Sequence, residues 1–93
     1  MLLFNQLLRK ERLRNKLDQS EVTALTGIPR TKISRYENAH QIPSPTNLEK
    51  LIQCYRPTKE VESMIRATYI PMVLIRRKVR GNSVKSIENA LNL

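Results

Sequence analysis

The chain of 93 residues has few of the residues that build disulfides, metal sites and phosphate-binding loops. It contains one cysteine, one histidine and two glycines, and it has no tryptophan. A single cysteine cannot form an internal disulfide, which agrees with a reducing, cytoplasmic compartment. Without a second histidine or a pair of cysteines, no zinc site can be built at the usual ligand spacings. Two isolated glycines also exclude a glycine-rich phosphate loop.

Residues that could carry out catalysis are equally scarce. His40 is the only histidine and stands in a polar segment, and the carboxylates are scattered along the chain. No triad or acid–base pair therefore emerges from the spacing of these groups. Cys54 stands beside Leu51 and Tyr55, which favours a small apolar residue at a core edge over a redox sensor. We expect a protein that is not an enzyme and that needs no cofactor and no metal ion.

The sequence also lacks a hydrophobic run that could cross a membrane. Its longest apolar stretch, residues 70–75, contains Pro71 and is far shorter than the ~20 residues that span a bilayer. The apolar start, residues 1–4, is too short for a signal peptide. Attachment to a membrane surface through residues 72–80 is an alternative, but that stretch is short and begins directly after a proline. We expect a cytoplasmic protein without a membrane partner.

Positive charge, in contrast, is abundant. Seventeen Lys and Arg residues against eight Asp and Glu residues give a net charge of +9, which attracts polyanions before any specificity arises. The cations gather in three segments, residues 9–16, 30–35 and 76–85. A chain of this length has room for one domain of about four to six short helices. A small domain with a polyanionic partner is therefore expected.

Residues 18–27 predict a short helix followed by a tight turn. Asp18 and Glu21 have the spacing of a capping box, in which each side chain accepts a hydrogen bond from the other residue's backbone N–H. A helix is therefore expected from Gln19 to Thr26. Gly27 then supplies the conformational freedom that a tight turn between helices requires.

A second helix, expected from Arg30 to Glu37, has an apolar side and a cationic side. Ile33 and Tyr36 are three residues apart and are expected to face the core. The outward-facing groups are Arg30, Thr31, Ser34 and Arg35, with Lys32 at the flank. Such donors can bind base edges and phosphates. The two helices and their turn therefore predict a helix-turn-helix, with double-stranded DNA as the partner.

Helices are expected on both sides of this pair. A first helix is expected over residues 3–15, with Asn5 as an alternative cap. Residues 38–43 are expected to form a loop, after which Ser44 caps and Pro45 opens a fourth helix that stops at Pro57. The apolar stripe of the first helix is expected to comprise Leu3, Leu7, Leu8, Leu13 and Leu17. That of the fourth is expected to comprise Leu48, Leu51, Ile52 and Tyr55.

The remaining chain predicts further helix. A fifth helix is expected to start at Thr58 and to be broken or kinked at Pro71. Residues 72–79 are then expected to form a short helix or a strand, and residues 84–91 a last helical stretch after a turn at 81–83. The buried face of the fifth helix is expected to comprise Val61, Met64, Ile65 and Tyr69.

Over about residues 7–55, the sequence resembles the lambda-repressor/Cro-like helix-turn-helix family, also called the XRE family. The resemblance is carried by Arg12, Gln19, Glu21, Gly27, Ile28, residues 33–38, Pro43, Ser44, Leu48 and Leu51. It implies an all-α fold, a compact five-helix lambda-repressor-like helix-turn-helix domain with a C-terminal helical extension. The DNA-binding domain is expected over residues 1–57 and the extension over residues 58–93. Because this family commonly dimerises, the extension is expected to carry the dimer contact.

The resemblance also implies roles for individual residues. The third helix is expected to enter the major groove. The expected base contacts are Pro29, Arg30, Thr31, Lys32 and Arg35. The expected phosphate contacts are Gln19, Asn38, His40 and Lys16. Arg12 and Glu37 match a family ion pair that ties the first helix to the end of the third.

Several positions depart from the family pattern, among them Thr23, Leu25 and Thr26 in the second helix. Ala39 and Lys16 stand where the family commonly has glycine. Either Asn38 takes the left-handed conformation, or the third helix ends differently. Pro29 replaces a hydroxyl cap and leaves an apolar contact for a thymine methyl group.

The function implied is that of a sequence-specific double-stranded DNA-binding transcriptional regulator, a repressor acting as a homodimer on a palindromic operator. One alternative is the antitoxin of a toxin–antitoxin pair, in which residues 58–93 would hold a protein partner. Another is a helix-turn-helix protein-interaction module that no longer recognises DNA. Arg30, Lys32 and Arg35 argue against this last alternative, because such a module has no need of three cations on this helix.

Overall fold

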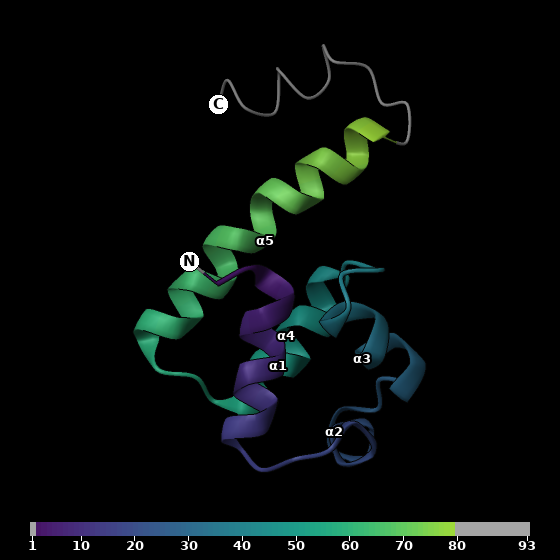
Figure 1. Cartoon of the computed structure of the whole chain (residues 1–93), viewed down its shortest axis with the longest axis vertical. Helices are drawn as coiled ribbons and strands as arrows, with labels where there is room; N and C mark the ends of the chain where they lie inside the picture. The colour runs from purple at the N-terminus through teal and green to yellow at the C-terminus, as the bar shows by residue number, and fades with distance from the viewer. Residues whose placement is uncertain (1, 80–93) are drawn as a thin grey trace.

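The computed structural model describes residues 2–79, and its side chains as far as residue 74, as an arrangement of five α-helices (Figure 1). They are α1 (Phe4–Arg14), α2 (Gln19–Thr26), α3 (Arg30–Glu37), α4 (Pro45–Tyr55) and α5 (Lys59–Val79). The predicted all-α fold is confirmed, and α2 and α3 have the predicted bounds. The stretches predicted over residues 81–83 and 84–91 lie outside the described residues.

Helices α2 and α4 begin where local side chains accept hydrogen bonds from free backbone N–H groups. Asp18 Oδ1 accepts from the backbone N of Glu21 at 2.7 Å, and Glu21 Oε1 accepts from the backbone N of Asp18 at 2.9 Å, which confirms the capping box. Ser44 Oγ accepts from the backbone N of Asn47 at 3.2 Å at the start of α4. Asn5 is not a cap: it lies inside α1, which follows the extended residue Leu3.

The buried face of α1 differs from the predicted stripe. Phe4, Leu7 and Leu8 are buried, and Glu11 and Arg12 continue the same face into the core. The predicted stripe residues Leu3 and Leu13 are instead 62% and 54% exposed. Leu3 precedes the helix, and Leu13 lies five residues after Leu8, so it points away from the buried face on a helix of 3.6 residues per turn.

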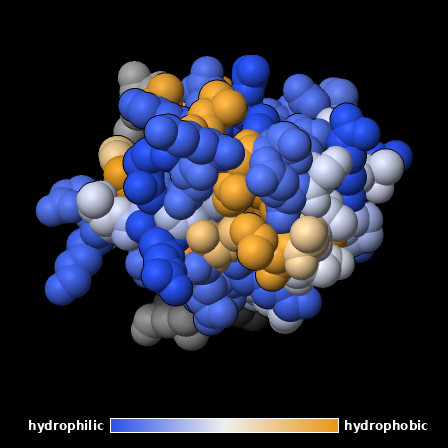
Figure 2. Space-filling model, turned by 90° about the horizontal axis from the view of Figure 1, so that it is seen from below, coloured by the Kyte–Doolittle hydropathy of each residue, from blue (hydrophilic) through white to orange (hydrophobic). Residues whose placement is uncertain are grey.

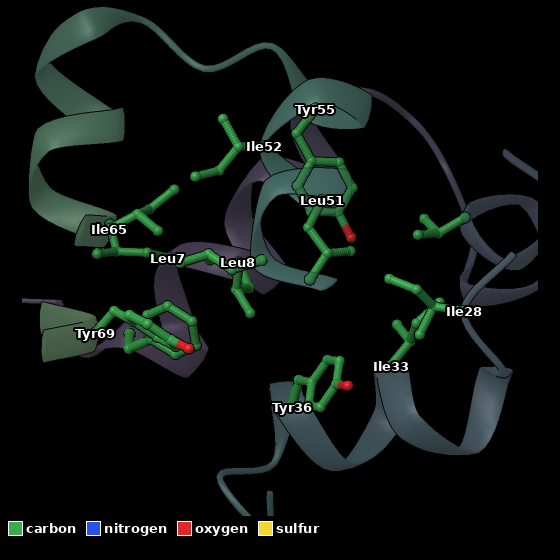
Figure 3. Close-up of a cluster of buried hydrophobic side chains, with 13 residues drawn as sticks. Leu7, Leu8, Ile28, Ile33, Tyr36, Leu51, Ile52, Tyr55, Ile65 and Tyr69 are labelled. Atoms are coloured by element: carbon green, nitrogen blue, oxygen red, sulfur yellow. The ribbon is translucent and has the colours of Figure 1, made fainter. Parts of the chain in front are cut away.

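One hydrophobic core joins the helices (Figure 3). Ile33 and Tyr36 of α3 are buried as predicted. The buried side chains of α4 are also the predicted ones, namely Leu48, Leu51, Ile52 and Tyr55. Cys54 is half-buried against this core, as expected, and burial raises the pKa of its thiol.

The first half of α5 belongs to the same core. Ile65 and Tyr69 are buried, the rings of Tyr69 and Phe4 lie 5.5 Å apart, and Tyr69 Oη donates to the carbonyl oxygen of Pro43 at 2.8 Å. Met64 was expected on this face but is 47% exposed. The core therefore extends beyond residue 57 into α5.

The predicted break at Pro71 is wrong, and so is the alternative of a strand over residues 72–79, because α5 continues through Pro71 to Val79. The proline removes one helical N–H donor, but it lies on the exposed side, where water can bind the carbonyl left without a partner. Met72 and Val73 beyond it still pack against the core. Among the helices over residues 2–79, none has the length and hydropathy to cross a bilayer.

Candidate nucleic-acid interface

Helix α3 presents one polar face to solvent. Arg30, Thr31, Lys32 and Arg35 are exposed, and Ser34 is half-exposed between them. Ile33 and Tyr36 point the opposite way and are 1% and 2% exposed. Pro29 precedes the helix and makes no side-chain cap, so the first turn of α3 is open to solvent. The helix can therefore approach a flat or grooved partner along this face.

The turn between α2 and α3 fixes the angle at which α3 is held. Gly27 adopts φ +79°, and its backbone N–H bonds to the carbonyl oxygen of Thr23 at 2.8 Å. Apart from the adjoining chain, no atom lies within 4 Å of the place a Cβ would occupy, so the backbone angle and not space calls for glycine here. The next residue, Ile28, is 2% exposed and anchors the turn in the core.

Helices α2 and α3 together form an open depression of about 310 Å³. It is lined by Gln19, Arg30, Thr31, Ser34 and Arg35. All five side chains carry hydrogen-bond donors, and none is a carboxylate. The structure thus places one expected phosphate contact, Gln19, next to three expected base contacts, in a site suited to an anionic ligand.

A buried ion pair lies behind this face. Arg12 Nε donates to Glu37 Oε2 at 2.7 Å and Arg12 Nη2 donates to Glu37 Oε1 at 3.0 Å, with side-chain exposures of 10% and 4%. These hydrogen bonds raise the pKa of the Arg12 guanidinium, against the opposing effect of burial. Arg12 Nη1 also donates to the carbonyl oxygen of Leu17 at 2.9 Å. The pair therefore ties α1 to the end of α3 and to the segment that leads into α2.

The other expected phosphate contacts lie at helix ends and not in the depression. Lys16 follows α1 and is exposed. Asn38 and His40 follow α3 and are also exposed. The Asn38 side chain donates back to the carbonyl oxygen of Ser34 at 2.9 Å, so part of its hydrogen-bonding capacity is already used within α3.

Of the two predicted ways in which α3 could end, the structure has the second: Asn38 does not take the left-handed conformation. Ala39 adopts the left-handed conformation with φ +61°, whereas Asn38 has φ −100°. The backbone N–H of His40 donates to the carbonyl oxygen of Arg35 at 2.8 Å, the bond that defines a Schellman motif. Lys16, with φ +58°, occupies the equivalent position after α1.

Two contacts at this site were not predicted. Gln19 Nε2 donates to Glu37 Oε1 at 3.3 Å, and Asn5 Nδ2 donates to the backbone oxygen of Glu37 at 3.3 Å. The first bond joins two residues that are 18 positions apart in the sequence, and the second joins two that are 32 positions apart. No local spacing signals such bonds, because they depend on how the helices pack.

Another depression, of about 490 Å³, lies at the C-terminal ends of α2 and α4. Leu25, which is 65% exposed, lines it together with Cys54 and Arg56. None of the expected DNA contacts is among its lining residues. Seen from below, the molecule shows a band of hydrophobic side chains across a mainly hydrophilic face (Figure 2).

Comparison with known proteins agrees with this geometry. A family model described as Helix-turn-helix matches residues 8–61, more than half of the chain. The matched segment contains α2, α3, every residue that lines the depression between them, and both members of the buried ion pair. No curated protein and no solved structure matches the chain.

Proposed function

Because the chain belongs to the XRE/lambda-repressor-like helix-turn-helix family of DNA-binding regulators, we propose that it is a repressor that binds a palindromic operator as a homodimer. The observation that carries the proposal is the outward face of α3, where Arg30, Lys32 and Arg35 are all exposed. A net charge of +9 supports association with the duplex.

In this proposal α3 lies in the major groove. Its first turn points toward the base edges, where the Arg30 guanidinium can bond both O6 and N7 of a guanine. Thr31, Lys32 and Arg35 contact neighbouring base pairs or their phosphates. Pro29 offers an apolar surface to a thymine methyl group.

Phosphates are held around the edge of this face. Gln19 stands at the first position of α2, where free backbone N–H groups and the helix dipole favour an anion. Lys16, Asn38 and His40 bind phosphates on either side through their exposed positions. These contacts place the protein on the duplex without distinguishing one sequence from another.

The proposed dimer contact lies on α5. Ile70 is 59% exposed and lines an apolar depression of about 210 Å³ with Pro45, Tyr69, Val73 and Leu74. Figure 1 shows the C-terminal half of α5 projecting beyond the other helices, where a second copy can reach it. A two-fold pair would place the two α3 helices about 34 Å apart, one turn of the duplex.

The test is selection of bound duplexes from a random pool, followed by fluorescence anisotropy on the enriched sequence. A palindromic motif is expected, with half-sites about one turn apart. If the dimer neutralises about six phosphates, log K falls against log salt with a slope of roughly −5. A slope near zero with no enriched motif would favour the protein-interaction module instead.

A further inference from the structure

The carboxylate of Glu37 accepts hydrogen bonds both from its ion-pair partner, Arg12, and from an expected DNA contact, Gln19. Its Oε1 accepts from Arg12 Nη2 at 3.0 Å and from Gln19 Nε2 at 3.3 Å. We propose that Glu37 is a positioning residue for DNA binding, which orients the Gln19 amide so that its remaining N–H meets a phosphate. This inference rests on the proposed function and assigns to the buried ion pair a part in DNA affinity.

The chemistry of the two groups explains why the orientation matters. A glutamine amide has two N–H donors on one side and a carbonyl oxygen on the other. A carboxylate only accepts hydrogen bonds, so Glu37 selects the N–H side of Gln19 and leaves a second N–H free for a phosphate oxygen. Without that acceptor the amide can turn its carbonyl oxygen toward the DNA, and an acceptor repels phosphate.

Glu37 is itself held firmly enough to act in this way. It is 7% exposed, Arg12 binds both of its carboxylate oxygens, and Asn5 Nδ2 donates to its backbone oxygen. Arg12 is fixed in turn by the carbonyl oxygen of Leu17. Arg12 also neutralises the carboxylate, so that an acidic residue can lie next to a phosphate contact without repelling DNA.

Gln19 lies where an oriented amide can contact a phosphate of bound DNA. Gln19 lines the donor-rich depression with Arg30, Thr31, Ser34 and Arg35. Gln19 is half-buried and its amide is bonded to Glu37, so its side chain is partly ordered before any ligand arrives. Ordering a glutamine in advance lowers the entropy that binding would otherwise cost.

The test replaces both charges at once. In the double variant Arg12→Met/Glu37→Met, the net charge is unchanged and the buried pair becomes apolar, an exchange that proteins often tolerate without loss of stability. We expect its affinity for every duplex to fall about tenfold, the loss of one hydrogen bond to a charged group. Gln19→Ala should cause the same loss, and the triple variant should show no further one.

A matched control is available on α1. Glu11 is 4% exposed and pairs with Arg14 at 2.9 Å, and neither residue has a hydrogen bond to Gln19 among the described contacts. Glu11→Met/Arg14→Met also conserves net charge and should leave DNA affinity within about twofold. If the Arg12/Glu37 variant does not fold, Glu37→Asp keeps the charges and withdraws the carboxylate from Gln19, with the same expected loss.

The possible outcomes separate this inference from the proposed function. Wild-type affinity in a folded Arg12→Met/Glu37→Met variant, alongside weakened binding in Gln19→Ala, overturns the positioning role. Unchanged binding in Gln19→Ala also overturns it, although the protein remains a DNA-binding regulator. If the unmodified protein binds no duplex, the proposed function itself has failed.

Discussion

Lys16, Ala39 and Arg56 hold left-handed backbone conformations, with φ of +58°, +61° and +47°. Each ends a helix, at α1, α3 and α4 respectively. An L-residue with a Cβ is strained there by about 1 kcal/mol, because its side chain crowds the following carbonyl oxygen. The chain accepts this cost three times among its described residues, so these positions leave room for added stability.

Ala39→Gly should raise the free energy of unfolding by about 0.5–1 kcal/mol, because glycine adopts positive φ without strain. Ala24→Gly is the matched control, since Ala24 is exposed within α2 and is not among the residues with positive φ. The same exchange there should lower stability by about 0.5–1 kcal/mol. Urea unfolding measures both; a loss of stability in both variants would refute the strain at Ala39.

Arg30→Ala should cost roughly 1–3 kcal/mol on the selected operator and relax the preference at one base pair. Gln19→Ala should instead weaken all duplexes about equally, because phosphates carry no sequence information. Lys59→Ala, at the start of α5, controls for the loss of one exposed charge. Competition titrations against specific and scrambled duplexes decide the matter, and equal losses from Arg30→Ala on both would make Arg30 a phosphate contact only.

At the scale of whole elements, α5 has two halves with different surroundings. Its first half is held in place by Ile65 and Tyr69 in the core and by Arg66, which binds Glu49 of α4 at 2.7 and 3.0 Å and Glu62 of its own helix at 3.0 Å. Arg66 and Glu49 are nearly half-exposed, so this pair adds little stability. The second half carries Ile70 on its surface, where the proposed partner binds.

Pro71→Ala should stabilise the protein by about 1–3 kcal/mol, because alanine restores a helical N–H donor and removes the clash with the preceding turn. Pro57→Ala is the comparison, since Pro57 lies between α4 and α5, where no helical bond can be restored. There the change should be neutral or destabilising by up to about 0.5–1 kcal/mol. Thermal unfolding followed by circular dichroism gives both changes in stability. Equal changes in the two variants would show that Pro71 does not strain α5.

Ile70→Arg should convert the proposed dimer to a monomer and weaken operator binding while the fold is retained. A point change is required because truncation after Arg56 would remove Ile65 and Tyr69 from the core. Met64→Arg is the control: Met64 is also exposed on α5, about 120° around the helix from Ile70. Sedimentation measures the change, and a dimer that survives Ile70→Arg would place the contact elsewhere.

For the molecule as a whole, the helix bounds that could be predicted are those set by local signals. Asp18 with Glu21, Gly27, and Ser44 with Pro45 mark helix ends through bonds to their near neighbours. The buried face of α1 could not be predicted from its apolar pattern, because the charged residues Glu11 and Arg12 interrupt that pattern. Both are buried as members of ion pairs, Glu11 with Arg14 and Arg12 with Glu37. The continuity of α5 was also missed, since its packing outweighs the local effect of one proline.

Part of the candidate site could likewise be predicted from the sequence, and part of it could not. The outward orientation of Arg30, Thr31 and Arg35 follows from the helical period once Ile33 and Tyr36 are placed in the core. The hydrogen bond between Gln19 and Glu37 does not follow from the helical period of either helix, because it requires the start of α2 to lie against the end of α3.

The buried pair of Arg12 and Glu37 also restricts how this sequence can change over generations. Replacing either residue alone leaves an uncompensated buried charge, which costs roughly 3–5 kcal/mol of the about 5–15 kcal/mol by which a domain is stable. Replacing both by apolar residues avoids that loss. Any stepwise route between the two solutions therefore passes through sequences that have lost a large part of their stability, so descendants of this chain should inherit both charges or neither.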